Sequence, residues 1–271
     1  MSAQEIFDRV LVGVDGTDYG FEALQQALAL APSASVVQTV TALDLTGVVQ
    51  TGWDSKRFAE MLERDAEQAR EKVAEILADR ANASARLVRG TAQTVLRHEI
   101  EAFAPTLLAL GGRRRSRFVG ALLGETASML LHDATYSVLL ARPQWGQRWR
   151  PDRVVVGMDG SAWSQVALTV ADELRGRLGS ELTVVAAKGG KTISEEGTWD
   201  DRVTEWDPRP PVDALCDRSR LVDLVVVGSR GLHGVRSLGS VSERVAHRAH
   251  SSVLVVHPGS DMPLGAEQPG I

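Results

Sequence analysis

The sequence has little of what secreted, membrane-spanning or nucleic-acid-binding proteins need. Its 271 residues include one cysteine, Cys216, so no disulfide can form within the chain, which suits a reducing compartment. No apolar run approaches the roughly 20 residues that span a bilayer, and the N-terminal segment has neither a basic start nor an apolar signal core. The formal net charge of −5 provides no general attraction to nucleic acid. We therefore expect a cytoplasmic protein that binds neither membranes nor nucleic acid.

The composition is that of a folded protein, with 44% hydrophobic and 24% charged residues. A chain of this length can form two domains that each bury a core. We place the first domain at residues 1–145 and the second at 151–259, and the linker at 144–151 contains two tryptophans. Residues 260–271 contain glycine and proline and are expected to form a flexible tail.

An internal repeat relates the two domains. Three segments recur in the same order, at offsets of 144, 117 and 115 residues: Val10–Thr17 as Val154–Ser161, Leu107–Gly111 as Leu224–Gly228, and Ser137–Pro143 as Ser252–Pro258. Three ordered matches indicate two copies of one fold. The fall in offset from 144 to 117 means that the second copy is 27 residues shorter in its early part.

Each copy alternates apolar strands with amphipathic helices. In the first copy we expect strands near 10–14, 36–43, 86–88, 107–111 and 137–141, with helices near 20–30, 55–80 and 93–103. In the second we expect strands near 154–158, 182–187, 224–228 and 252–256, with helices near 164–174, 212–221 and from 240 onwards. No counterpart of the 55–80 helix is visible there, and residues 189–197 are polar and loop-like. The pattern predicts an α/β fold of two repeated Rossmann-like domains, each an open parallel five-stranded sheet flanked by helices.

The repeat also predicts where a ligand would bind. In open parallel sheets, ligands lie beyond the carboxyl ends of the strands, where the strand order reverses. Asp15 and Asp159 follow the first strand of each copy, and a glycine-containing loop follows the fourth. In the second copy this loop ends at a helix start with Ser240, so backbone amides and a hydroxyl could hold a phosphate. Turn glycines before a helix are common, and the aspartates could instead cap their turns or hold a metal.

These motifs resemble those of the universal stress protein family. In the second copy the resemblance rests on four segments: the Val-Gly-Met-Asp-Gly-Ser start, the Val-Val-Val-Gly-Ser-Arg-Gly loop, the Gly-Ser-Val-Ser helix start and the closing Ser-Val-Leu-Val-Val. The first copy is similar, so the chain resembles a tandem, two-domain member over nearly its whole length. The resemblance implies adenine nucleotide alpha hydrolase-like domains. In ATP-binding members the aspartate contacts adenosine, and a pattern of Gly, two residues, Gly, nine residues, Gly, then Ser or Thr holds the phosphates.

Carried over by position, the resemblance implies ATP contacts in both copies. In the second copy they are Asp159, Gly228, Gly231, Gly239 and Ser240, although seven residues, not nine, separate the last two glycines. In the first copy they are Asp15, Gly111, Gly124 and Thr126. There the spacing is kept, but Arg114 replaces the middle glycine and Glu125 the hydroxyl residue. The arginines at 113–115 and 117 could bind an anion through their side chains or form a solvated basic loop.

The resemblance implies a stress-response regulator that binds ATP or another adenine nucleotide. The alternative is an interaction or scaffold protein of the same fold that has lost its ligand. At most a weak ATPase is expected, since neither loop offers magnesium ligands and a group that orients water. We expect no metal cofactor, because His132 and His247 lie in separate copies without ligand spacing.

Family members commonly associate through the last strand of the domain. Residues 137–141 and 252–256 are apolar and are expected to pair, which would join the two copies as an internal pseudo-dimer. Two such chains could also form a homodimer.

Overall fold

The computed structural model describes residues 7–48, 55–112, 125–132, 134–143, 149–187, 201–229 and 241–258. The first half contains the strands β1 (Arg9–Gly13), β2 (Val36–Leu43), β3 (Ala83–Arg89), β4 (Leu107–Gly111) and β5 (Ser137–Ala141). Its helices are α1 (Asp18–Leu30), α2 (Ser55–Ile76), α3 (Ala92–Phe103) and α4 (Glu125–His132). The second half contains β6 (Arg153–Met158), β7 (Glu181–Ala187), β8 (Glu205–Asp207), β9 (Leu224–Gly228) and β10 (Ser252–Val256). Its helices are α5 (Ala162–Leu178), α6 (Pro211–Arg218) and α7 (Val241–Arg248).

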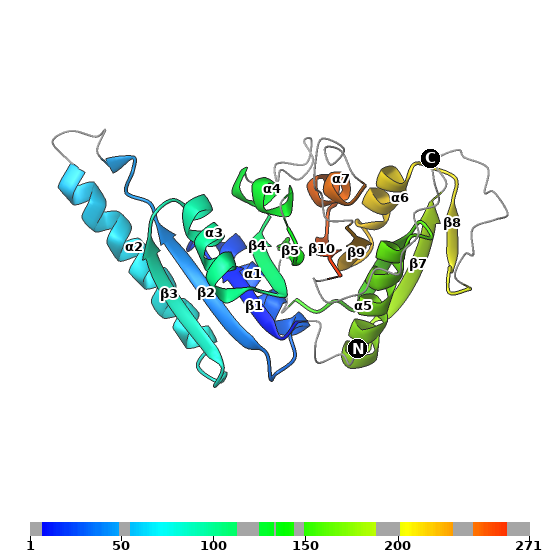
Figure 1. Cartoon of the computed structure of the whole chain (residues 1–271), viewed down its shortest axis with the longest axis horizontal. Coiled ribbons are helices and arrows are strands. Elements are labelled where there is room, and N and C mark those ends of the chain that lie inside the picture. Colours follow the sequence, from blue (N-terminus) through cyan, green and yellow to red (C-terminus); the bar gives the residue numbers. More distant parts are fainter. Residues whose placement is uncertain are drawn as a thin grey trace.

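The ten strands of the described residues belong to one sheet, in the order β3-β2-β1-β4-β5-β10-β9-β6-β7-β8. These strands are parallel within each half, and the antiparallel pair β5 with β10 joins the halves at the centre of the sheet (Figure 1). Every residue of β5 and β10 is buried. The predicted α/β fold with five parallel strands in each half is confirmed, and so is the pairing of the two last strands.

Helices cover both faces of this sheet, and each face forms a core that continues across the junction. One core unites side chains of α1, α2 and α5, including Leu24 and Leu168. The other unites side chains of α3, α4, α6 and α7, including Leu96 and Leu215. Strand β1 shows why its sequence is apolar throughout: Val10 faces the first core and Leu11 the second, so the strand is buried on both sides.

Polar contacts reinforce the junction between the halves. Arg142 directly follows β5 and is only 1% exposed. Its guanidinium donates hydrogen bonds to the backbone oxygens of Ser251 and Ala246, across the junction. Ser252 donates from Oγ to Gln26 Oε1 of α1 at 2.6 Å and accepts from Arg142 N at 2.9 Å. These bonds supply partners to groups that burial would otherwise leave without them.

Several element bounds differ from those expected. Strand β3 begins at Ala83, because it pairs with β2 along seven residues although its own pattern is partly polar. Helix α2 ends at Ile76 rather than at 80, and α5 continues to Leu178, where Gly179 caps it with a φ of 72°. Strand β8 was not located from the sequence. It takes the edge position in the second half that β3 takes in the first.

Some expectations concern residues outside the described ranges. These are the polar segment at 189–197, the arginine loop at 113–117 and the tail at 260–271. Within the described ranges, no helix is both long enough and apolar enough to cross a membrane.

Candidate functional site

The strand order reverses once in each half, and a pocket lies at each reversal. In the first half β1 pairs with β2 on one side and with β4 on the other. In the second half β6 pairs in the same way with β7 and β9. Crossover connections leave opposite faces of the sheet at such a point and open a crevice beyond the carboxyl ends of the strands. A pocket in each half is lined by residues from these strand ends.

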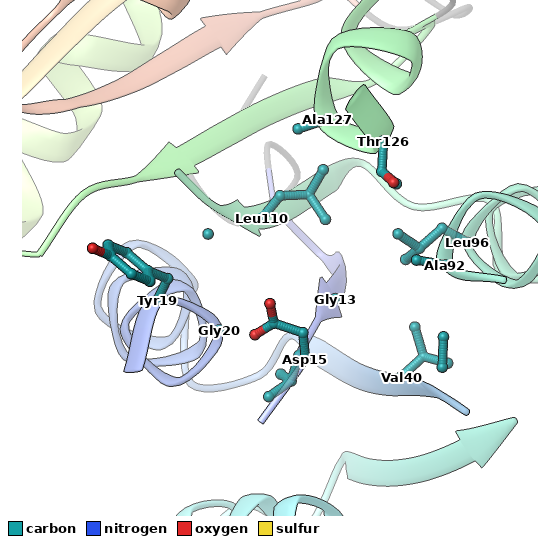
Figure 2. Close-up of a pocket in the computed structure, with 13 residues that line it drawn as sticks. Gly13, Asp15, Tyr19, Gly20, Val40, Ala92, Leu96, Leu110, Thr126 and Ala127 are labelled. Carbon is teal, nitrogen blue, oxygen red and sulfur yellow. The ribbon is translucent and has the colours of Figure 1, made fainter. Parts of the chain in front are cut away.

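The first-half pocket has a volume of about 250 Å³ and is mostly apolar. The Asp15 carboxylate lies on one side of it, and Val40, Ala92 and Leu96 lie across from it (Figure 2). Thr126, in the first turn of α4, adds a hydroxyl to the wall. An apolar slot with a few polar groups is the usual composition of a small-molecule site.

Asp15 is held in place by the turn between β1 and α1. Its Oδ1 accepts hydrogen bonds from Thr17 N at 3.1 Å and Thr17 Oγ1 at 2.6 Å. Thr17 in turn caps α1 by accepting from Gly20 N, and Gly16 between them has a φ of 75°. No residue of the described ranges donates to Asp15 Oδ2. Asp15 therefore anchors its turn with one oxygen and leaves the other for hydroxyl or amine donors of a ligand.

The second-half pocket repeats this arrangement in a volume of about 150 Å³. Asp159 Oδ1 accepts from Ser161 N at 3.0 Å and from Ser161 Oγ at 2.5 Å, and Ser161 caps α5. The wall differs from that of the first pocket. Ser164 and Trp163 line it where the repeat places Gly20 and Tyr19 in the first half, and Pro211 lines it at the start of α6.

Gly111 and Gly228, the first glycines of the two loops, have a packing role of their own. A Cβ on Gly111 would lie 2.6 Å from Tyr19 O and 2.7 Å from Tyr19 C, and a Cβ on Gly228 would collide with the Trp163 carbonyl group. The first turns of α1 and α5 thus lie closer to these two positions than a residue with a Cβ would allow. These two glycines are needed to shape the pockets whether or not a ligand is bound.

The structure brings part of each predicted site together. Asp15, Gly111 and Thr126 line the first pocket, and Asp159 and Gly228 line the second. The remaining predicted contacts lie outside the described ranges: Gly124, Gly231, Gly239 and Ser240. Sequence reasoning missed the apolar wall that β2 and α3 supply. The alternation along β2 and the apolar face of α3 carry that signal, but only the sheet order shows that they face Asp15.

The described residues offer no group of three or more histidine, cysteine or acidic side chains that could hold a metal ion. Cys216 lies on α6 in the second core, where burial raises the pKa of its thiol. A raised pKa makes the reactive thiolate scarcer, so Cys216 acts as a packing residue.

Comparison with known proteins decides the family. The profile described as "Universal stress protein family" matches residues 6–142 and 192–257. The chain belongs to the universal stress protein family. A universal stress protein of Mycolicibacterium smegmatis is 30% identical over 92% of this chain and 97% of its own length. One of Mycobacterium bovis is 27% identical over 96% of this chain and 98% of its own length. Matches that span both halves show a tandem member.

Solved structures confirm the fold. A universal stress protein from Archaeoglobus fulgidus superposes with a TM-score of 0.71 at 22% identity, covering 93% of this chain and 99% of its own. One from Pseudomonas aeruginosa gives a TM-score of 0.67 at 15% identity, covering 94% of this chain and 95% of its own. The second family match starts at residue 192 and so omits β6, α5 and β7. The strands β6 and β7 nevertheless take the places in the second half of the sheet that β1 and β2 take in the first.

Proposed function

We propose that this universal stress protein is a cytoplasmic stress-response regulator that binds ATP or another adenine nucleotide at a strand-order reversal. The observation that carries the proposal is the pocket geometry: an apolar slot beside a carboxylate whose second oxygen has no donor among the described residues. A purine ring suits the slot, and ribose hydroxyls suit the carboxylate. Asp15 is the candidate for this contact in the first half, and Asp159 is the candidate in the second.

The phosphate end of the proposed ligand would lie towards the loops that follow β4 and β9. The candidate contacts there are Gly111, Gly124 and Thr126 for a nucleotide in the first half, and Gly228, Gly231, Gly239 and Ser240 for one in the second. Gly111 and Gly228 support the proposal because each lines its pocket at the end of a strand, β4 or β9. Thr126 supports it because its hydroxyl lines the first pocket.

The family resemblance adds support, since the implied adenosine contact falls on the two aspartates that line pockets. We further propose that the chain divides into domains at 1–145 and 151–259, and that whole chains pair as homodimers. The described residues bring no magnesium-binding acidic cluster to either pocket. We accordingly propose a regulator whose ATPase activity is at most weak.

A second candidate is an interaction protein whose pockets no longer bind a nucleotide. The small volume of the second pocket favours this function for the second half. Under this reading the chain would act through protein partners alone.

Isothermal titration calorimetry separates the two functions. ATP, ADP and AMP are titrated into the wild-type chain, with GTP as the base control and tripolyphosphate as the phosphate control. Binding of adenine nucleotides that is lost in the double variant Asp15→Ala, Asp159→Ala is the expected result. Absence of heat at millimolar nucleotide would overturn the nucleotide proposal and leave the interaction protein.

A further inference from the structure

The two pockets differ in capacity although they share one architecture. The first has about 250 Å³ and the second about 150 Å³. Ligand pockets start at roughly 300 Å³, so the first is close to that range. The second has only about half of that lower bound. One pocket is therefore close to the size that a nucleoside needs, and the other is not.

The helix start beside the aspartate contributes to the difference. A Cβ on Gly20 would lie 2.7 Å from Asp15 Oδ1 and 2.9 Å from Asp15 N, closer than real side chains approach. Asp15 and the start of α1 can thus hold their positions only because residue 20 is a glycine. In the second half Ser164 takes this place, with its side chain buried and its Oγ donating to Ser161 O at 2.8 Å. The hydrogen bonds of the Asp159 turn match those of the Asp15 turn, but a side chain takes the place of the Gly20 hydrogen at the start of α5.

The opposite wall differs in the same direction. Ala92 presents only a methyl group at the start of α3, whereas Pro211 presents a ring at the start of α6. At the third wall, Thr126 and Ala127 in the first turn of α4 line the first pocket, and Val241 and Ser242 at the start of α7 line the second. The second pocket thus differs from the first in the space that it offers, since a carboxylate and hydroxyl side chains line both.

We infer that the nucleoside binds only in the first-half pocket, with Asp15 as its polar contact, and that Gly20 and Ala92 determine this choice. The inference rests on the proposed function. The chain then binds one nucleotide, and the second half serves as a closed structural copy of the site. Ser164 and Pro211 are the residues that keep it closed.

Matched single variants test the inference. AMP, whose nucleoside fills most of the molecule, is titrated calorimetrically into the wild type, Asp15→Ala, Asp15→Asn and Asp159→Ala. We expect one site per chain, at least about 10-fold weaker binding in both Asp15 variants, and less than about twofold change in Asp159→Ala. The Asp159 variant loses the same turn anchor, so it controls for local destabilisation. Circular dichroism verifies that each variant is folded.

Exchanging the walls gives a second test. Gly20→Ser with Ala92→Pro should remove AMP binding, because it gives the first pocket the walls of the second. Proline is tolerated at the first position of a helix, so α3 should persist. Ser164→Gly with Pro211→Ala should leave wild-type affinity at the first site unchanged.

The outcomes separate the inference from the proposed function. No AMP or ATP binding by the wild type would overturn both. Two sites per chain, or binding that survives in Asp15→Ala but not in Asp159→Ala, would overturn the inference and leave the proposed function standing.

Discussion

The two edge strands of the sheet, β3 and β8, are held in place by different interactions. In the first half, β3 pairs with β2 along seven residues, and the helix α2 covers both strands through apolar side chains that include Ala69 and Val73. In the second half, β8 pairs with β7 along three residues, and charged side chains fix it. Asp207 is 5% exposed and receives hydrogen bonds from Arg209 and Arg218. An edge strand of this fold can thus be held either by a helix that packs apolar side chains on it or by a network of charged side chains.

The comparison extends to function. The first half has both the long helix α2 and the larger pocket, whereas the described residues of the second half include no helix between β7 and β8 and line a smaller pocket. The central strands and their two cores are nevertheless shared. Such a pattern is expected when one copy of a duplicated domain keeps the common core while its edge strand and its pocket diverge.

The largest expected effect tests whether the halves fold as one unit. Leu24 in α1 and Leu168 in α5 occupy equivalent positions, are fully buried and belong to the same core. Replacing either by alanine should lower the free energy of unfolding by about 3 kcal/mol, because each leaves a cavity. Chemical denaturation should show one transition, shifted equally by both variants. Two transitions, each sensitive to one variant, would show that the halves unfold separately.

The next effect separates packing from binding. Alanine at Gly111 or Gly228 pushes a Cβ into the first turn of α1 or α5, which should cost about 2 kcal/mol in either half. Gly111→Ala should also weaken AMP binding, because it displaces the helix start beside Asp15. Gly228→Ala should leave AMP binding intact. Thermal unfolding and calorimetry on the same samples measure both effects, and equal losses of affinity would contradict the difference between the pockets.

The ion network predicts a pH dependence that is specific to the β8 edge. Hydrogen bonds from Arg209, and then from Arg218, hold the pKa of Asp207 well below its usual range. A carboxylate with a lowered folded-state pKa contributes stability that is fully present above its unfolded pKa of about 3.9 and is lost as the pH falls below it. Asp207→Asn should cost about 1.5 kcal/mol at pH 7 and progressively less below pH ~4.

The control for that prediction lies at the rim of the same network. Asp217 pairs with Arg209 but is exposed, so Asp217→Asn should change the free energy of unfolding by less than about 0.5 kcal/mol. Denaturation midpoints between pH 3 and pH 7 measure both variants. A loss for Asp207→Asn that stayed constant over this range would argue against the charge of Asp207 as its cause.

The strands and the pocket residues differ in how far the sequence predicts them. The central strands were predictable because runs such as 10–14 and 224–228 are apolar throughout and recur at matching places. Strand β8 was not, because its three residues are held by Arg218, which comes from another element. Asp15 was found from its place after a strand. The wall formed by Val40 and Leu96 was not, because it depends on which crossover covers which face.

The smallest expected effect concerns Trp163, one of the residues that line the second pocket. Trp163→Phe keeps an aromatic side chain and leaves the backbone carbonyl that packs on Gly228. If the second pocket is closed to nucleosides, this variant should change AMP affinity by less than about twofold, within the range of surface substitutions. AMP added to the wild type should likewise leave the Trp163 contribution to fluorescence, taken as the difference between wild type and variant, unchanged. Quenching of that contribution by AMP would place a nucleoside beside Trp163 and give the second half a binding role of its own.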